Sequence, residues 1–243
     1  MNNKKSLLIS LLVLLAVVVA GGLVTKYLLD KLTQAEARID VIEKVIFPPK
    51  EEEEVQKEAF DVPVGNSFVL GPKDAPISVT VFSNFQCPYC AMADTALRTL
   101  VNNEKLQGKV NLVFKHFPFD RHASARPASK AAFAAGEQGN DKFWAMSEKI
   151  FAHQSDLKEK NPEQLNKMFT AWAKEIGCDV NKFEADLKAN DQKYDDQINQ
   201  DIKLGAEKAE LRGTPWILVN GWLLKGDINA ETILSMSKEH KLQ

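Results

Sequence analysis

The sequence predicts an α/β domain with a long helical insertion, preceded by an apolar N-terminal helix and a helical stalk. Two runs of β-branched and apolar residues, Ile77–Phe82 and Val110–Phe114, flank a predicted helix. A long helical stretch follows, and near the C-terminus two short strands are separated by Asn220-Gly221, a strong hairpin signal. Strands that alternate with helices in this way are typical of α/β domains.

Composition excludes several classes of protein. The chain has 243 residues, 44% of them hydrophobic, and a formal net charge of -2 without a basic stripe, so nucleic acid is not an expected partner. Three cysteines, Cys87, Cys90 and Cys178, are too few for a disulfide scaffold. A zinc site would need two further ligands beside the Cys87–Cys90 pair. Neither Cys178 nor the histidines show a second pair of closely spaced ligands, so no metal site is predicted. The histidines are His116, His122, His153 and His240.

The N-terminal segment, residues 1–25, is predicted to be a transmembrane anchor or a signal peptide. Lys4 and Lys5 precede the uncharged stretch 6–25, which is close to the length of about 20 residues that a membrane-spanning helix needs. Cleavage after Ala20 is the alternative, and it remains open. Both interpretations predict that the rest of the chain is extracytoplasmic, on the periplasmic side, and the first anchors it to the inner (cytoplasmic) membrane.

Residues 26–47 form the predicted stalk, because apolar or small residues recur in steps of four and three. These seam residues are Leu28, Leu32, Ala35, Ile39, Ile42 and Ile46. Two interpretations are open: one amphipathic helix, or a parallel coiled coil that joins chains into a homo-oligomer. Isoleucine at both core positions of the second half favours a trimer or larger assembly over a dimer.

An acidic linker is predicted over residues 48–60. Pro48-Pro49 ends the stalk helix, since proline lacks the amide N–H that a helix needs. The four glutamates 51–54 repel one another, and such a run is usually solvated. We therefore expect the folded domain to comprise residues 61–243, beginning near Phe60.

Within that domain, the first helix should begin at the Cys87–Cys90 turn, run to about Leu106 and close at Gly108. The helical insertion covers about residues 120–209. Breaks are expected inside it at Pro162, Gly177 and Gly205. The remaining elements are strands at 216–219 and 222–224 and a closing helix from 229 to about 241.

Cys87-Pro88-Tyr89-Cys90 is the motif that carries chemistry. The unsatisfied N–H groups and the dipole at a helix start favour a thiolate at Cys87, which is the nucleophile in disulfide exchange. Cys90 lies one turn further on and can resolve a mixed disulfide. Pro88 has the φ angle that suits the first turn of a helix. A buried pair or half of a metal site is the alternative, but the position between a strand and a helix favours a redox pair.

A second signal is Gly213-Thr214-Pro215, directly before an apolar strand. A proline tolerates a cis peptide bond, which would present the Thr214 backbone to an extended peptide beside the sulfurs. An ordinary loop proline explains the segment equally well when it is taken alone. Together with Cys87 and Cys90, the motif favours substrate binding by Thr214 and Pro215.

These segments resemble the DsbA-like family of the thioredoxin superfamily over roughly residues 65 to 240. The matching segments are Phe82-Ser83-Asn84-Phe85-Gln86-Cys87-Pro88-Tyr89-Cys90, Lys115-His116-Phe117-Pro118, Phe143-Trp144 and Gly213-Thr214-Pro215, followed by a strand and Asn220-Gly221. The resemblance implies a thioredoxin fold with a helical domain inserted between its second and third strands, a cis Thr214-Pro215 bond and extracytoplasmic dithiol–disulfide exchange. Two positions depart from the family, Val81 and Asn84, where many relatives have acidic residues; a carboxylate there would accept the proton of the resolving thiol.

The sequence thus predicts an enzyme that exchanges disulfides in exported proteins. No cofactor is expected other than the Cys87–Cys90 disulfide itself. An unidentified membrane protein is the expected redox partner. Thr214 and Tyr89 resemble the isomerase-like family members, so a stalk-dependent isomerase is the more specific hypothesis. A membrane-tethered holdase that grips unfolded chains is the alternative from another class.

Three further side chains lie outside these motifs. Cys178 falls on an apolar periodicity at a helix boundary, so a small buried hydrophobe is expected. His116 follows a strand and is expected to be hydrogen-bonded scaffold rather than a ligand. Trp222 follows the hairpin turn and is the tryptophan that we expect to contact substrate.

Overall fold

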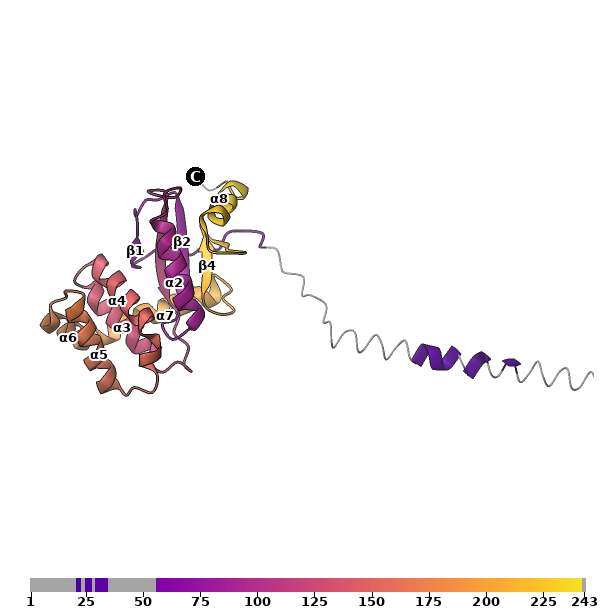
Figure 1. Ribbon diagram of the computed structural model, residues 1–243, viewed down its shortest axis with the longest axis horizontal. Coiled ribbons are helices and arrows are strands. Elements are labelled where there is room, and N and C mark those ends of the chain that lie inside the picture. Colours follow the sequence, from indigo (N-terminus) through magenta and orange to yellow (C-terminus); the bar gives the residue numbers. More distant parts are fainter. Residues whose placement is uncertain (1–20, 23–24, 28, 35–55, 242–243) are drawn as a thin grey trace, which may run out of the picture. The chain divides into compact units, whose positions relative to one another are not determined.

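A computed structural model describes residues 21–22, 25–27, 29–34 and 56–241. The chain divides into two units, Met1–Val55 and Gln56–Gln243 (Figure 1). The described residues of the first unit are helical, but most of the predicted membrane segment and stalk lie outside the described residues; of the seam residues, only Leu32 is described. No helix within the described ranges is long and apolar enough to cross a membrane.

The second unit is built on a mixed sheet of five strands in the order β1-β3-β2-β4-β5. Its central strands, β2 (Ile77–Ser83) and β3 (Val110–His116), are parallel, with Ile77 opposite Val110 and Ser83 opposite His116. The other pairings are antiparallel. β3 extends two residues beyond the predicted strand, and the edge strand β1 (Val69–Leu70) was not predicted.

Side chains alternate between the two faces of the sheet and form two apolar clusters. One face contributes Val79, Val81 and Phe114 to the large core, which helices α2 (Pro88–Val101) and α8 (Ala230–Glu239) cover. The opposite face carries a smaller cluster around Phe82, which the C-terminal end of α7 (Asp191–Glu207) helps to cover.

Helix α2 begins where the sequence predicts and ends earlier. Pro88 is its first residue, and Asn102 caps its C-terminus, so the prediction of a helix to about Leu106 is wrong. The chain turns over residues 104–109, and the side chain of Leu106 is fully buried. The apolar residue that suggested another helical turn therefore packs from a loop. Gly108 closes this loop rather than the helix, with φ of 74°.

The insertion between β3 and β4 is helical throughout, as predicted. Figure 1 shows helices α3 to α6 gathered beside the sheet. Its elements are α3 (Ala125–Gly136), α4 (Asn140–Ala152), the 3₁₀ turn η1 (Gln154–Leu157), α5 (Pro162–Glu175), α6 (Val180–Ala189) and α7. Pro162 starts a helix and Gly177 follows one, as expected. Gly205 instead lies within α7, where a Cβ would sit 2.9 Å from Phe117 Cε2, so glycine serves close packing there.

The C-terminal part is a hairpin of β4 (Trp216–Val219) and β5 (Trp222–Leu223), followed by α8. Asn220 and Gly221 have φ of 46° and 85°, which suits the predicted two-residue turn. Phe60 N donates to Gly221 O (2.9 Å), and the Gln56 side chain bonds Gly221 O and Leu223 N. Contacts of the folded unit thus include Gln56, within the segment assigned to the linker.

Candidate redox site

Cys87 is the N-cap residue of α2, directly after the turn that follows β2. Its backbone N–H donates to Asn84 O (3.0 Å), and its carbonyl accepts from Cys90 N (3.0 Å). All three cysteines are free thiols, and the exposed fraction falls from 8% at Cys87 to 1% at Cys90. Pro88 and Tyr89 between them are exposed. The sulfur nearer the surface is therefore that of the predicted attacking residue.

The Thr214–Pro215 loop lies beside these sulfurs. Its peptide bond is cis, and the Cys87 thiol donates to Thr214 O at 3.3 Å. Strand pairing explains the meeting of residues so far apart in sequence, because Trp216 at the start of β4 is opposite Phe82 near the end of β2. The structure thus brings together all six predicted site residues around one helix start.

Burial separates the chemistry of the two thiols. Desolvation raises the pKa of Cys90 to about 12, although the Asn84 backbone N–H, 3.4 Å from Cys90 Sγ, acts in the opposite direction. Val81 is 4% exposed and packs in the same apolar cluster as Cys90. The resemblance to DsbA-like proteins would place an acid at this position, but the side chain here is apolar and accepts no proton.

Asn84, the second departure from the family, organises the turn before Cys87. Its Oδ1 accepts from Gln86 N (2.9 Å), which orients the amide so that Nδ2 faces His122 Nδ1 at 2.9 Å. His122 Nδ1 must therefore be the acceptor, which requires a neutral ring. Burial and the nearby Arg121 charge both lower the pKa of His122, which favours that state.

Two residues of the insertion, Ser124 and Gln154, also form hydrogen bonds with residues 84–87, which we call the redox loop. Sequence reasoning missed both. Ser124 N donates to Gln86 Oε1 (2.7 Å), and Gln154 Nε2 donates to Phe85 O (2.7 Å) and Cys87 O (3.0 Å). No motif or spacing signals contacts between residues that lie 38 to 69 positions apart.

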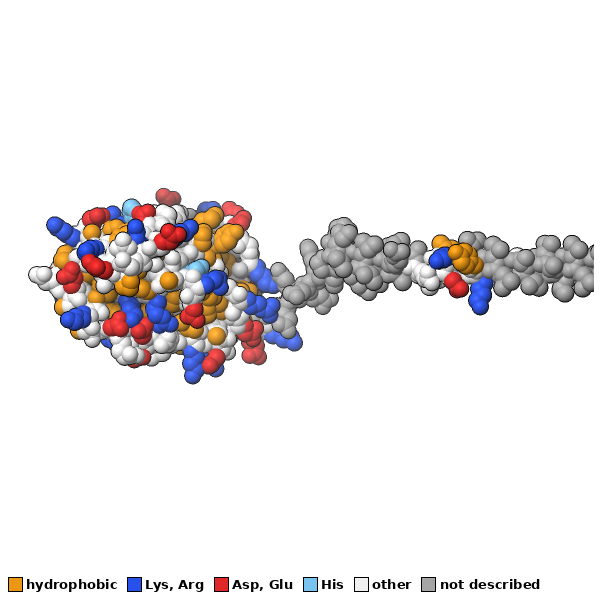
Figure 2. Space-filling model, turned by 90° about the horizontal axis from the view of Figure 1, so that it is seen from below, with side chains coloured by type: hydrophobic (Ala, Val, Ile, Leu, Met, Phe, Trp, Pro, Cys, Tyr) orange, Lys and Arg blue, Asp and Glu red, His pale blue; other side chains and the backbone are white. Residues whose placement is uncertain are grey.

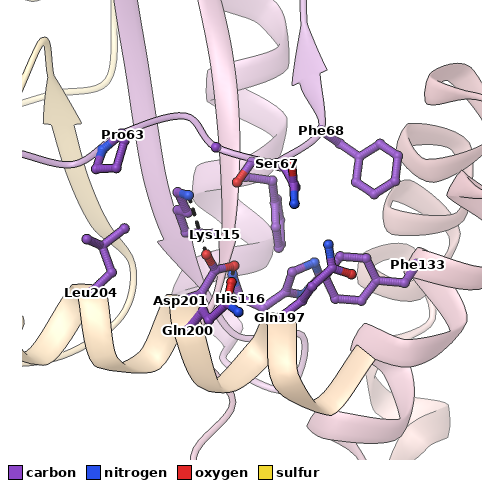
Figure 3. A pocket seen from close by; sticks show the side chains of 13 residues that line it. Pro63, Ser67, Phe68, Lys115, His116, Phe133, Gln197, Gln200, Asp201 and Leu204 are labelled. Atoms are coloured by element: carbon purple, nitrogen blue, oxygen red, sulfur yellow. Dashed lines mark hydrogen bonds and ion pairs between the residues drawn. The ribbon is translucent and has the colours of Figure 1, made fainter. Parts of the chain in front are cut away.

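A pocket of about 230 Å³ lies at the end of β3, between residues 63–68 and α7 (Figure 3). At its base, Lys115 Nζ pairs with Asp201 Oδ1 (3.4 Å) and donates to Val64 O (3.1 Å). Asp201 Oδ2 accepts the backbone N–H of His116 (2.8 Å). Burial, with the Lys115 charge, lowers the pKa of His116 to about 3, and its ring nitrogens have no hydrogen-bond partner among the described residues. His116 is thus a structural residue that is held through its backbone N–H and not through its ring.

The remaining predictions have mixed outcomes. Cys178 is buried, as expected, and burial raises the pKa of its thiol. Trp222 lies beside Val219, at the start of β2 rather than at the Cys87 end, and its ring stacks on His240 with centroids 3.8 Å apart. Trp222 thus lies away from the Cys87 end of β2, and its expected contact with substrate stays a prediction. Within the described part of the chain, no group of three or more His, Cys, Asp or Glu side chains is placed to hold a metal ion.

A family profile described as Thioredoxin matches residues 64–238. The chain belongs to the thioredoxin family. This thioredoxin-family chain is 34% identical over 166 residues to the Na(+)/H(+) antiporter NhaA 1 of Salinispora arenicola, covering 68% of the chain and 23% of that protein. It thus spans about a quarter of the length of such relatives. It is also 32% identical over 163 residues to the probable disulfide bond formation protein D of Bacillus cereus, covering 66% of the chain and 73% of that protein.

Solved structures agree on the fold. BdbD from Bacillus subtilis superimposes with a TM-score of 0.62 at 21% identity, covering 74% of this chain and 96% of BdbD. The thiol-disulfide exchange protein alpha-DsbA2 from Wolbachia pipientis gives a TM-score of 0.59, also at 21% identity, covering 73% and 87%. The thioredoxin-like α/β fold with a helical insertion, expected from the resemblance to DsbA-like proteins, is confirmed.

Proposed function

We propose that this thioredoxin-family chain is a thiol–disulfide oxidoreductase that exchanges disulfides in exported proteins through Cys87 and Cys90. The observation that carries the proposal is the arrangement of three groups at the start of α2. Cys87 caps the helix and touches the backbone of the cis-proline loop, while Cys90 is buried behind it. The names of the Bacillus cereus and Wolbachia pipientis relatives support the same chemistry.

Exchange follows from this geometry in two displacements. The Cys87 thiolate attacks one sulfur of a client disulfide, an S–S bond forms between them, and the second client sulfur leaves as a thiolate. Cys90 then loses its proton and attacks Cys87, which releases the first client sulfur and leaves a Cys87–Cys90 disulfide. The client gains two electrons, and the chain's dithiol loses them. The reverse sequence oxidises a client dithiol.

Cys90 is the slow partner in this scheme, because its thiol must ionise in an apolar setting. Burial raises its pKa to about 12, and Val81 offers no carboxylate to accept the proton. Water or hydroxide is left as the base, so resolution of mixed disulfides should quicken as the pH rises.

Insulin reduction with a thiol reductant tests the proposal. Wild type should reduce insulin, Cys87→Ser should not, and Cys90→Ser should accumulate mixed disulfides with clients. A holdase would reduce no insulin, yet would suppress aggregation equally well with both cysteines replaced by serine. That pattern would establish the alternative, a membrane-tethered binding module for unfolded chains.

The more specific proposal is an isomerase that works as an oligomer, with a trimer as the favoured form. The heptad pattern of residues 26–47 supports it, because several active sites that share a client raise the effective concentration of thiol. Chains that begin at Lys26 and at Gln56 separate the roles of stalk and domain. The longer chain should sediment as an oligomer and refold scrambled ribonuclease faster; two monomers of equal activity would reduce the stalk to a spacer.

An extracytoplasmic location, with residues 6–25 as an anchor in the cytoplasmic membrane, completes the proposal. Lys4 and Lys5 before an uncharged stretch support this orientation. A membrane protein that exchanges electrons with the Cys87–Cys90 pair is the expected redox partner. Fractionation with protease protection tests the location: the domain should be digested from the outer side of the membrane, whereas protection there would contradict it.

A further inference from the structure

Gln154 contacts the redox loop from the helical insertion. It is the first residue of η1, directly beyond α4, and its side-chain amide reaches back 67 positions to the start of α2. Its Nε2 donates to Phe85 O at 2.7 Å and to Cys87 O at 3.0 Å. An amide nitrogen carries two N–H groups, so one side chain serves both carbonyls.

Those two carbonyls define the path of the chain into the helix. Cys87 O is the first acceptor of α2, since Cys90 N (3.0 Å) and Ala91 N (3.3 Å) both donate to it. Phe85 lies inside the turn that the bond from Cys87 N to Asn84 O closes. Fixing both carbonyls fixes the backbone on either side of Cys87, and with it the direction in which the sulfur projects.

The base of Gln154 is itself held firmly. Leu157, the last residue of η1, is fully buried, and its carbonyl accepts from Ser124 Oγ at 2.8 Å. Ser124 N in turn donates to the Gln86 side chain at 2.7 Å. The segments that carry Ser124 and Gln154 are thus joined to each other as well as to the loop, so Gln154 is anchored at both ends.

From these contacts we propose that Gln154 is a positioning residue for the redox centre. It acts through the carbonyls of Phe85 and Cys87 to hold Cys87 at the N-cap of α2, with its sulfur beside Thr214 O. This role rests on the proposed disulfide exchange, and it gives the helical insertion a direct part in that exchange. Gln154 donates its hydrogen bonds to backbone oxygens rather than to a sulfur, so it is a positioning residue and not a catalytic one.

Two substitutions of Gln154 separate the effect of its amide donors from the effect of its volume. Leucine has a similar volume but no donor, so Gln154→Leu leaves both carbonyls without this partner. An ionised glutamate is a pure acceptor, so Gln154→Glu sets a carboxylate against two carbonyl oxygens and adds a negative charge near a thiolate. Protonated glutamate can donate one hydrogen bond. The defect of Gln154→Glu should therefore shrink as the pH falls toward the usual carboxyl range, about 4.3.

The test is the rate of Cys87 alkylation against pH, resolved by peptide mass spectrometry in reduced full-length protein carrying Cys178→Ala. For Gln154→Leu we expect the midpoint of the rate curve to move to higher pH, with insulin reduction slowed about fivefold or more, the order expected when neutral hydrogen bonds to the backbone are lost. At pH 7.5, Cys87 of Gln154→Glu should be alkylated still more slowly than Cys87 of Gln154→Leu. At pH 4.5, its alkylation rate relative to wild type at the same pH should equal or exceed that of Gln154→Leu.

Gln164→Leu is the matched control. Gln164 lies in the same insertion and accepts from Asn161 N in the capping box of α5, away from the redox loop. It should lower the melting temperature without moving the alkylation curve. If Gln154→Leu behaves like this control, with a normal alkylation curve and normal insulin reduction, the proposal is overturned.

Two further outcomes are also decisive. If Gln154→Leu does not fold, the pH response of Gln154→Glu decides. A constant ratio of its alkylation rate to that of wild type from pH 4.5 to 7.5 overturns the proposal, and a ratio that falls as the pH rises supports it. If wild type fails to reduce insulin while Gln154 variants still shift the alkylation curve, the proposed function fails and the positioning role stands.

Discussion

Replacing Lys115 by methionine tests the buried ion pair that joins β3 to α7. The side chain of Lys115 is 5% exposed and that of Asp201 13%, so neither charge can turn to water when its partner is removed. Breaking such a pair typically costs 3–5 kcal/mol, and we expect the lower end, about 3 kcal/mol at pH 7, because Asp201 keeps the hydrogen bond from His116 N.

The loss should depend on pH, with a definite sign. Burial raises the pKa of Asp201, and the Lys115 charge opposes that rise. A carboxyl with a raised pKa holds its proton longer in the folded state, so it lowers stability as the pH rises from about 4 through the folded-state value. Without Lys115 the pKa of Asp201 rises further. The deficit should therefore fall to about 1 kcal/mol near pH 4, where the carboxyl is neutral and only the bond to Val64 O is missing.

Urea unfolding followed by tryptophan fluorescence at pH 7 and pH 4 measures both quantities. Lys167→Met is the matched control, since Lys167 pairs with Glu163 on the surface of α5 and is 76% exposed; its removal should cost no more than about 0.5 kcal/mol. Adding Asp201→Asn to Lys115→Met should recover most of the loss at pH 7. A deficit below 1 kcal/mol at pH 7, or equal deficits at both pH values, would refute an ionised pair in the folded protein.

Three further predictions concern the thiols and the turn before them. Because the pKa of Cys90 is raised from 9.0 to about 12, its thiolate fraction at pH 7 falls about a thousandfold, so alkylation of the reduced protein should label Cys87 first; equal labelling rates would contradict this. Cys178→Ala should keep full insulin reduction and lose about 1 kcal/mol of stability in urea, and an activity loss like that of Cys87→Ser would assign this thiol to the reaction. The bond from Asn84 to neutral His122 predicts that wild type loses stability as the pH falls below about 6.5, since the lowered pKa of His122 means that the unfolded state binds the proton more readily. His122→Gln, which keeps an acceptor that does not titrate, should remove that slope, and an unchanged slope would show that the bond is not the cause.

Local patterns predict the parts of the fold that local chemistry determines. The strands around β2, the Asn220-Gly221 turn and the start of α2 at Pro88 all follow from residues adjacent in sequence. The end of α2 does not, because Leu106 continues the apolar periodicity although it packs from a loop. Asn102 and Asn103 were the available signal: Asn102 caps the helix, and Asn103 Oδ1 accepts from Lys105 N at 3.0 Å. β1, with two residues, is too short for any period to appear.

The candidate site shows the same division. Cys87, Cys90 and the cis-proline loop are recognisable from motifs, whereas the side chains that hold them are not. Gln154 and His122 reach the redox loop across 67 and 38 positions, through contacts that exist only after the insertion has folded against the sheet. Glutamine and histidine are common at solvent-exposed positions near helix ends, so no sequence pattern singles out these two.

The attachment of Gln56 and Phe60 to the β4–β5 hairpin decides which end of the folded unit receives the preceding chain. Gly221, their common acceptor, lies next to Asn220, whose backbone N–H donates to Ser78 O at the beginning of β2. Cys87 follows the other end of that strand, and seven residues of strand span roughly 20 Å. The reactive sulfur therefore lies at the opposite end of β2 from the hairpin where Gln56 and Phe60 attach, so it is clear of the point at which the chain enters the folded unit.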